Sequence, residues 1–342
     1  MKKETFNLVM RLLIGVAASL IIVGAIGLIT ESASNRTLLE QAGGLKGGEV
    51  VMTVDGEAVS AEEYLYMTAY AAQSLSYYGI TDLSMELGEG MTAADFVAEQ
   101  AEGQIVATAA LRAWAKEQGV TLTEEDMAAL QAQKDAYGGE AGFQQTLKMV
   151  GVSEALFDNL MTQDMLYNHL YEIYCGKDGA QRPSEADLEI LAGEHKLVSA
   201  YVLVMDAAAE GAKEKMEDYA ARLAEAENTA ELVAAFAEEL QCDGAVQTFD
   251  CCHSSPVNDA LMALEMNGVS AVVEAEGGLR VLVRTALDLD TVAYVNFSEV
   301  YNHRVSNAVV EEKSVLEKID VAAFYAKYTQ LQQNAVAAMT QG

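Results

Sequence analysis

The stretch VMTVDGEAVSAEEY, Val51 to Tyr64, decides how the main part of this chain folds. Its opening residues are apolar or β-branched and lead into Asp55-Gly56, so we expect a short strand over residues 50–54 that ends in a turn. Ser60 and Glu63 then have the spacing of a capping box, which predicts a helix from residue 60 to about residue 78. Whether the strand pairs locally or with the last strand of the chain stays open.

More helices follow, and each has a start or a stop signal. Thr92 with Asp95 and Thr123 with Asp126 repeat the capping spacing, and glycines stand where the helical patterns end. The predicted helices cover residues 60–78, 92–118, 123–138, 140–149, 153–175 and 184–194.

The pattern changes after residue 195. Strands are expected at 198–205 and 246–250, helices at 207–226, 229–240 and 256–266, and a hairpin at 269–274 and 279–285. This order predicts a compact α+β module over residues 195–290. From residue 292 the chain is helical again, so residues 49–194 and 291–342 are expected to form one mainly helical domain around the module.

The N-terminus carries a separate signal. Residues 12–30 are 19 uncharged residues, and Lys2, Lys3 and Arg11 precede them. The length fits a membrane-spanning helix, and the positive flank predicts that residues 1–11 form a cytoplasmic tail. A cleaved signal peptide is the alternative, but its apolar core would be shorter, so we predict an uncleaved single-pass anchor in the cell membrane.

A flexible linker is expected between the anchor and the folded body. Residues 31–48 are largely polar and end in a glycine-rich run from Gly43 to Gly48. The bulk of the chain would then lie outside the cytoplasm.

The charge balance excludes one class of partner. The chain has 52 acidic and 21 basic residues and a formal net charge of −31. Binding to phosphates needs clusters of Lys and Arg, so nucleic acid is not expected as a partner. About half of the residues are hydrophobic (51%), which argues against disorder.

Four cysteines offer few options. Cys251, Cys252 and His253 suggest a metal ligand group, but no second ligand pair follows at zinc spacing, so we predict no metal site. Two alternatives stay open for these cysteines: a disulfide between Cys242 and Cys251, or thiols that are all unpaired. No motif for a cofactor occurs, and none is predicted.

Four segments together resemble a known family. They are Val51–Tyr64, PSEADL at 183–188, VSAYVLV at 198–204, and NGVSAVV with GGLRVL between 267 and 282. Their order and spacing are similar to those of the membrane-anchored extracytoplasmic foldases of the PrsA/SurA type. The resemblance implies a SurA-like chaperone domain with an inserted parvulin-type peptidylprolyl isomerase module.

The resemblance also identifies the catalytic positions, and this chain departs from the family there. Parvulin pockets are built around a hydrogen-bonded histidine pair with a nearby Cys or Asp. Here the histidine positions hold Tyr201 and Arg280, and Cys242 or Asp243 stands at the third. Arginine is permanently charged and cannot act as a neutral imidazole, so we expect a catalytically degenerate module.

The resemblance implies binding of unfolded or exported polypeptides near the membrane. Tyrosine and methionine stripes in the helices belong either to the core or to a surface for such clients. The candidate client contacts are Tyr66, Tyr70, Met161 and Met165. Two other functions stay open, namely an active peptidylprolyl isomerase and a helical adaptor for one dedicated partner.

Overall fold

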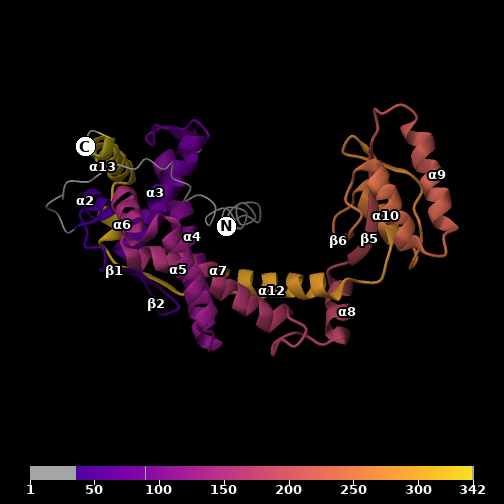
Figure 1. Cartoon of the computed structure of the whole chain (residues 1–342), viewed down its shortest axis with the longest axis horizontal. Coiled ribbons are helices and arrows are strands. Elements are labelled where there is room, and N and C mark those ends of the chain that lie inside the picture. Colours follow the sequence, from indigo (N-terminus) through magenta and orange to yellow (C-terminus); the bar gives the residue numbers. More distant parts are fainter. Residues whose placement is uncertain (1–35, 89, 341–342) are drawn as a thin grey trace. The chain divides into compact units, whose positions relative to one another are not determined.

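The computed structural model describes residues 36–88 and 90–340, and the chain divides into two compact units. Unit 1 contains the chain up to Leu170 and again from Tyr301, and unit 2 is Tyr171–Val300 (Figure 1). Unit 1 is thus assembled from two distant parts of the sequence. The division places residues 171–194 and 291–300 in unit 2, whereas the sequence assigned them to the helical domain.

Unit 1 contains a small antiparallel sheet in the order β2-β1-β9. The strands are β1 (Val50–Val54), β2 (Glu57–Ser60) and β9 (Val310–Glu312). The turn from β1 to β2 uses Asp55 and Gly56, whose positive φ values of 52° and 78° suit a tight hairpin. Strand β1 therefore pairs locally with β2, one of the two predicted alternatives. Its second neighbour is β9, which lies in the segment predicted to be helical, and not the last predicted strand at 279–285.

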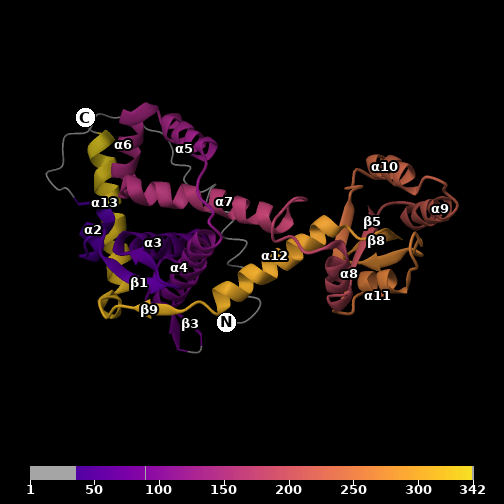
Figure 2. The same ribbon diagram turned by 90° about the horizontal axis from the view of Figure 1, so that it is seen from below.

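Helices α3 (Ala61–Tyr77) and α4 (Ala93–Glu117) pack against this sheet, and further helices precede and follow them in the chain (Figure 2). These further helices are α2 (Leu38–Gly43), α5 (Glu124–Ala136), α6 (Gly139–Val150), α7 (Glu154–Cys175), α12 (Leu289–Ser306) and α13 (Val321–Thr340), with a 3₁₀ turn at Leu316–Lys318. A short hairpin, β3 (Glu86–Gly88) and β4 (Met91–Thr92), lies between α3 and α4. The unit boundaries fall within α7 and α12, so these two helices are shared between the two units.

The predicted helix starts rest on side-chain caps. Thr92 with Asp95 and Thr123 with Asp126 form complete capping boxes. At α3 the Ser60 hydroxyl accepts from the Glu63 backbone N–H, but the Glu63 carboxylate bonds Arg112 instead of completing the box.

The predicted flexible linker over 31–48 needs correction within the described residues. Thr37 and Glu40 form a capping box that starts α2, and Leu39 is fully buried in the core. Helix α13 packs against α2, so burial from the far end of the sequence orders this segment.

Unit 2 is built on an antiparallel sheet in the order β6-β5-β8-β7. The strands are β5 (Leu197–Asp206), β6 (Val246–Asp250), β7 (Val273–Ala275) and β8 (Gly278–Arg284), and the helices are α8 (Glu185–Glu194), α9 (Ala212–Ala224), α10 (Thr229–Leu240) and α11 (Pro256–Ala263). Figure 2 shows α10 and α11 on opposite sides of the sheet. The predicted α+β class is confirmed.

Two clusters of buried side chains pack on the two faces of this sheet. Leu203 and Val281 belong to the cluster with α9 and α10, which we call the α9/α10 face. Val202 and Leu282 belong to the cluster with α11, which we call the α11 face.

No helix within residues 36–88 and 90–340 has the length and apolar character that a membrane span requires. The predicted cytoplasmic tail, the anchor at 12–30 and the start of the linker lie outside the described residues.

Candidate functional site

The two histidine positions of the parvulin pattern lie on opposite faces of the unit 2 sheet. Tyr201 of β5 stands opposite Val283 and packs against the α9/α10 face. Arg280 of β8 stands opposite Val204, which packs against the α11 face. Because alternate strand residues point to opposite faces, the two side chains cannot form the paired arrangement that the resemblance implied.

Arg280 has a structural partner set of its own. Its guanidinium donates to the Ala275 carbonyl and, at 2.8 Å, to a Glu276 carboxylate oxygen. Ala275 ends β7, and Glu276 lies with Gly277 in the β7–β8 turn, where both have positive φ values. Arg280 therefore fastens this turn.

Cys242 shares a face with Tyr201. It follows α10, and its backbone N–H donates to the Ala237 carbonyl at 3.0 Å. Both side chains are half-buried against the α9/α10 face, and no hydrogen bond between them is found in the described structure. The three predicted catalytic positions are thus only partly brought together, with a hydroxyl and a thiol on one face and the guanidinium on the other.

The remaining thiols point to different partners. Cys251 donates weakly to the Phe249 carbonyl, and exposed Cys252 donates to the His195 carbonyl at 3.3 Å. All four cysteines are free. Within the described part of the chain, no group of three or more Asp, Glu, His or Cys residues is placed to hold a metal ion.

The predicted client contacts divide into core and partly exposed residues. Tyr66 is 9% exposed and belongs to the core, and burial raises its pKa to about 12. Its choice as a client contact is therefore corrected. Met161 and Met165 are half-buried and pack against the same core. Tyr70, in the middle of α3, is half-buried.

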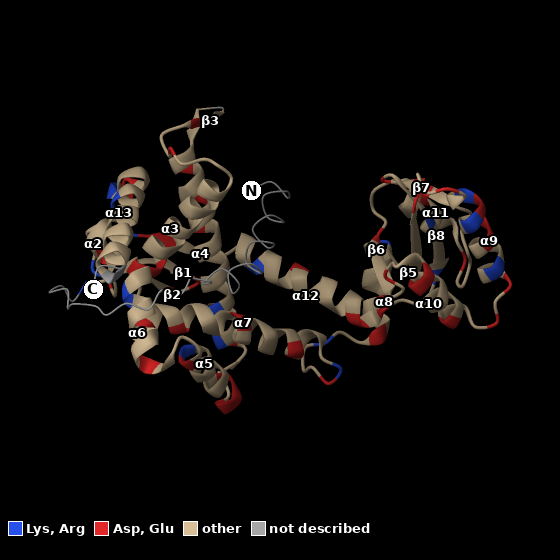
Figure 3. Ribbon diagram, turned by 45° about the horizontal axis from the view of Figure 1, so that its top comes forward, with Lys and Arg blue, Asp and Glu red and all other residues tan. Residues whose placement is uncertain are grey.

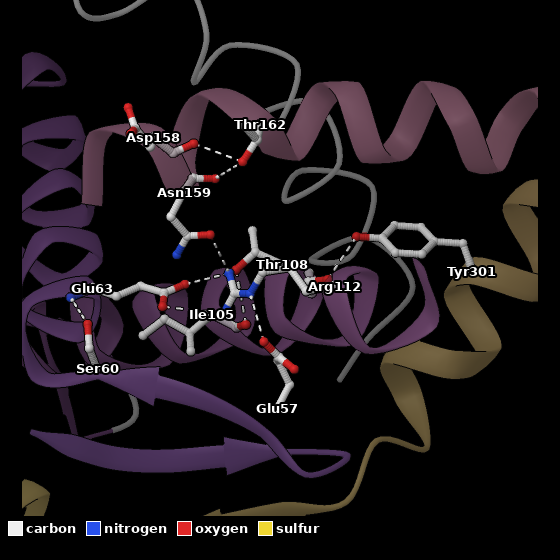
Figure 4. Close-up of polar contacts among 11 residues, drawn as sticks. Glu57, Ser60, Glu63, Ile105, Thr108, Arg112, Asp158, Asn159, Thr162 and Tyr301 are labelled. Atoms are coloured by element: carbon white, nitrogen blue, oxygen red, sulfur yellow. Dashed lines mark hydrogen bonds and ion pairs between the residues drawn. The ribbon is translucent and has the colours of Figure 1, made fainter. Parts of the chain in front are cut away.

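A buried ion pair between Arg112 and Glu63 connects several elements of unit 1 (Figure 4). Arg112 of α4 makes two hydrogen bonds to the Glu63 carboxylate of α3, at 2.8 and 3.3 Å. The same guanidinium contacts Glu57 of β2 at 3.8 Å and Asn159 of α7 at 3.4 Å. Since the Arg112 and Glu63 side chains are only 11% and 3% exposed, the pair fixes three helices and a strand relative to one another.

A second carboxylate of α3 caps α7. Glu62 is buried and accepts from the Ser153 backbone N–H at 2.8 Å and from its hydroxyl at 2.6 Å. The start of α7 therefore has a negative charge beside its unsatisfied N–H groups.

Several exposed large apolar side chains of unit 1 lie between the end of α3 and strand β3. We call this group the hairpin tip, and its members are Tyr77 (88% exposed), Tyr78 (77%), Met85 (42%) and Leu87 (38%). Figure 3 shows β3 projecting from the helices around it. The tyrosine rings meet edge to face, with centroids 5.8 Å apart. Exposed aromatic side chains in contact with each other, such as Tyr77 and Tyr78, are a feature of interaction surfaces.

The hairpin tip is held in place by its base. Leu83 is buried in the core, and the Ala93 N–H donates to the Met85 carbonyl at 2.8 Å. Asp82 accepts from the Ser84 hydroxyl and N–H, which lowers the pKa of its carboxyl. The turn that carries the hairpin tip is thus fixed by a buried leucine and by hydrogen bonds. The sequence signal was the pair Tyr77-Tyr78 directly before Gly79, at the predicted end of the helix.

Comparisons with solved structures find weak likenesses. Foldase protein PrsA from Streptococcus pneumoniae is 15% identical, with 75% of this chain and 99% of that chain covered and a TM-score of 0.28. PrsA from Bacillus subtilis is 14% identical (73% and 90% covered, TM-score 0.29), and foldase protein PrsA from Lactococcus lactis is 15% identical (83% and 99%, TM-score 0.29). These TM-scores are too low for fold or function to be inferred from them. No curated protein matches the sequence.

The family match covers the N-terminal half. The family model described as SurA-like N-terminal domain matches residues 1–171 of the 342 residues. This confirms the resemblance first seen in the strand, turn and helix of Val51–Tyr64. The chain therefore belongs to the SurA-like N-terminal domain family.

Proposed function

We propose that this protein is a membrane-anchored, extracytoplasmic folding factor that binds unfolded exported polypeptides. The hairpin tip is the observation that carries the proposal. It exposes apolar side chains to solvent on a protein whose formal net charge is −31. Unfolded chains expose the apolar segments that such a surface accepts. Tyrosine and methionine suit varied clients, since one is amphipathic and the other adaptable.

The isomerase-like module acts in this proposal as a binding or structural part. Support comes from Tyr201 and Arg280, which lie on opposite faces, and from the engagement of Arg280 with the β7–β8 turn. The half-buried hydroxyl and thiol of Tyr201 and Cys242 offer no imidazole pair.

Client binding is tested with the full chain in lipid nanodiscs. The wild type should suppress aggregation of a refolding model protein, and the double variant Tyr77→Ser/Tyr78→Ser should lose most of this suppression while keeping its melting temperature. The control is Ile190→Ser in α8, which removes one exposed apolar side chain (61% exposed) from unit 2. Equal suppression by the wild type and the tip variant would remove the tip from the proposal.

Isomerase activity is tested separately with a protease-coupled proline peptide assay. The full chain should leave the rate at its uncatalysed value, and Tyr201→Phe and Cys242→Ser should change nothing. Turnover by the wild type that either variant abolishes would instead establish an active isomerase with altered pocket chemistry.

The location is part of the proposal and rests on residues 12–30 and their basic flank. The full chain should stay with membranes after alkaline extraction, and protease added outside intact protoplasts should remove the body of the chain. Recovery of a shortened, soluble chain from the medium would show that the N-terminal segment is a cleaved signal.

A further inference from the structure

Strand β6 forms one edge of the unit 2 sheet and has few of the usual protections of an edge strand. It pairs with β5 over five consecutive residue pairs, from Tyr201 opposite Val246 to Leu197 opposite Asp250, without a register shift. The other edge of the same sheet, β7, has three residues and packs against α11.

The edges of the unit 1 sheet are better protected. Strand β9 has three residues, two of them glutamates, and β2 packs against α4. Natural sheet edges are commonly blocked by charges, proline, bulges or brevity. The sequence of β6, VQTFD, carries its only charge at the last residue and contains no proline.

Neighbouring hydrogen bonds identify which backbone groups of β6 face outward. The Cys251 N–H donates to the Lys196 carbonyl, so in an antiparallel ladder Phe249 and Gln247 also bond to β5. Asp250, Thr248 and Val246 then point their N–H and C=O groups away from β5. The Asn258 side-chain amide donates to the Asp250 carbonyl at 3.0 Å, which agrees with this assignment.

The outward groups of Val246 and Thr248 have no protein partner among the described residues. Together they are two donors and two acceptors in a row, spaced as an additional strand requires. The Phe249 side chain is half-buried against the α11 face, so an apolar residue beside it would extend that cluster.

We propose that β6 accepts an extended segment of a polypeptide client as an additional strand of the unit 2 sheet. This inference rests on the proposed function for the identity of the partner, and it adds a second binding surface to the hairpin tip. Asp243, three residues before β6, and Asp250, its last residue, are exposed, and the chain is strongly acidic. The preferred segment is therefore β-branched and apolar at alternate positions, with basic residues at its ends.

The variant Val246→Pro tests the edge directly. It removes one outward N–H without removing a hydrogen bond to β5, and proline is tolerated where an edge strand turns its N–H to solvent. The matched control Val246→Ala shortens the same side chain but keeps the N–H. The probe is a fluorescent seven-residue peptide of alternating valine and threonine with a lysine at each end, measured by anisotropy with the full chain.

The wild type and Val246→Ala should bind the peptide similarly, and Val246→Pro should bind it about fivefold more weakly, the effect of one hydrogen bond. A peptide N-methylated at alternate nitrogens should also bind the wild type more weakly, which tests the edge without any variant. Equal binding in both comparisons would overturn the proposal.

Two further outcomes separate the proposals. One outcome is that the wild type suppresses aggregation, but neither Val246→Pro nor N-methylation of the peptide weakens peptide binding. The edge proposal then fails and the proposed function stands. If peptide binding depends on the Val246 N–H but aggregation is not suppressed, the proposed function fails alone. A dimer that Val246→Pro dissociates, with no peptide binding by the wild type, would assign the edge to a second copy and overturn the inference.

Discussion

The ion pair between Arg112 and Glu63 predicts a large loss of stability when either partner is removed. Arg112→Met leaves Glu63 uncompensated with 3% of its side chain exposed, and breaking a buried pair in this way costs about 3–5 kcal/mol. For a domain of this size each 1 kcal/mol shifts the melting temperature by about 2–4 °C, so the expected fall is about 6–20 °C. Glu63→Gln should give a similar fall.

The assay is thermal unfolding followed by circular dichroism, with Arg112→Met, Glu63→Gln and the double variant compared. The double variant should lose less than the sum of the single losses, because it leaves no isolated buried charge. Lys116→Met is the control. Its ammonium group is 3.9 Å from Glu57 in the same network, but the side chain is 81% exposed, so the change should stay within about 0.5 kcal/mol. A loss no larger than that of the control, or strict additivity, would refute the reasoning.

Two other predictions concern titratable groups. Hydrogen bonds from the Thr123 N–H, His169 and the Thr123 hydroxyl lower the Asp126 pKa to about 2, so its stabilisation is present above the ordinary carboxyl pKa and is lost as the pH falls toward 2. The difference in melting temperature between the wild type and Asp126→Asn should accordingly shrink from pH 6 to pH 2, and a constant difference would contradict this. Burial raises the Cys175 pKa to about 11, while Cys252 is exposed. Maleimide labelling at pH 7.5, mapped by mass spectrometry, should therefore modify Cys252 well before Cys175, and simultaneous labelling would contradict the described burial.

Local signals predicted most helices well, because each carried its own start. Thr92 and Thr123 cap α4 and α5 as the spacing indicated. Helix α2 was missed although Thr37 and Glu40 had the same spacing. Its six residues are too few to be stable alone, and the contact that buries Leu39 comes from α13.

The same limit applies to the candidate site. In α3 every residue from 61 to 69 is buried, so the pattern of tyrosines along the helix does not distinguish core from surface there. Tyr66 lies in the core, whereas Tyr77, at the end of the same helix, lies beyond it. The positions of Tyr201 and Arg280 could be read from the sequence, but their placement on opposite faces depends on the β5–β8 register, which only the folded sheet defines.

The interrupted sequence of unit 1 has a consequence for the order in which the chain folds. Strand β1 gains its second neighbour only when residues 310–312 arrive, and Asp55 bonds Val309 across 254 positions of the chain. Tyr328 likewise reaches back to the Val150 carbonyl. A chain that is synthesised from its N-terminus can therefore fold unit 2, which is continuous in sequence, before unit 1 is complete. During that time β1 has no partner strand on the side that β9 later occupies. We expect this protein to pass through a stage in which unit 1 is incompletely folded, and a chain shortened before residue 308 should remain in that stage.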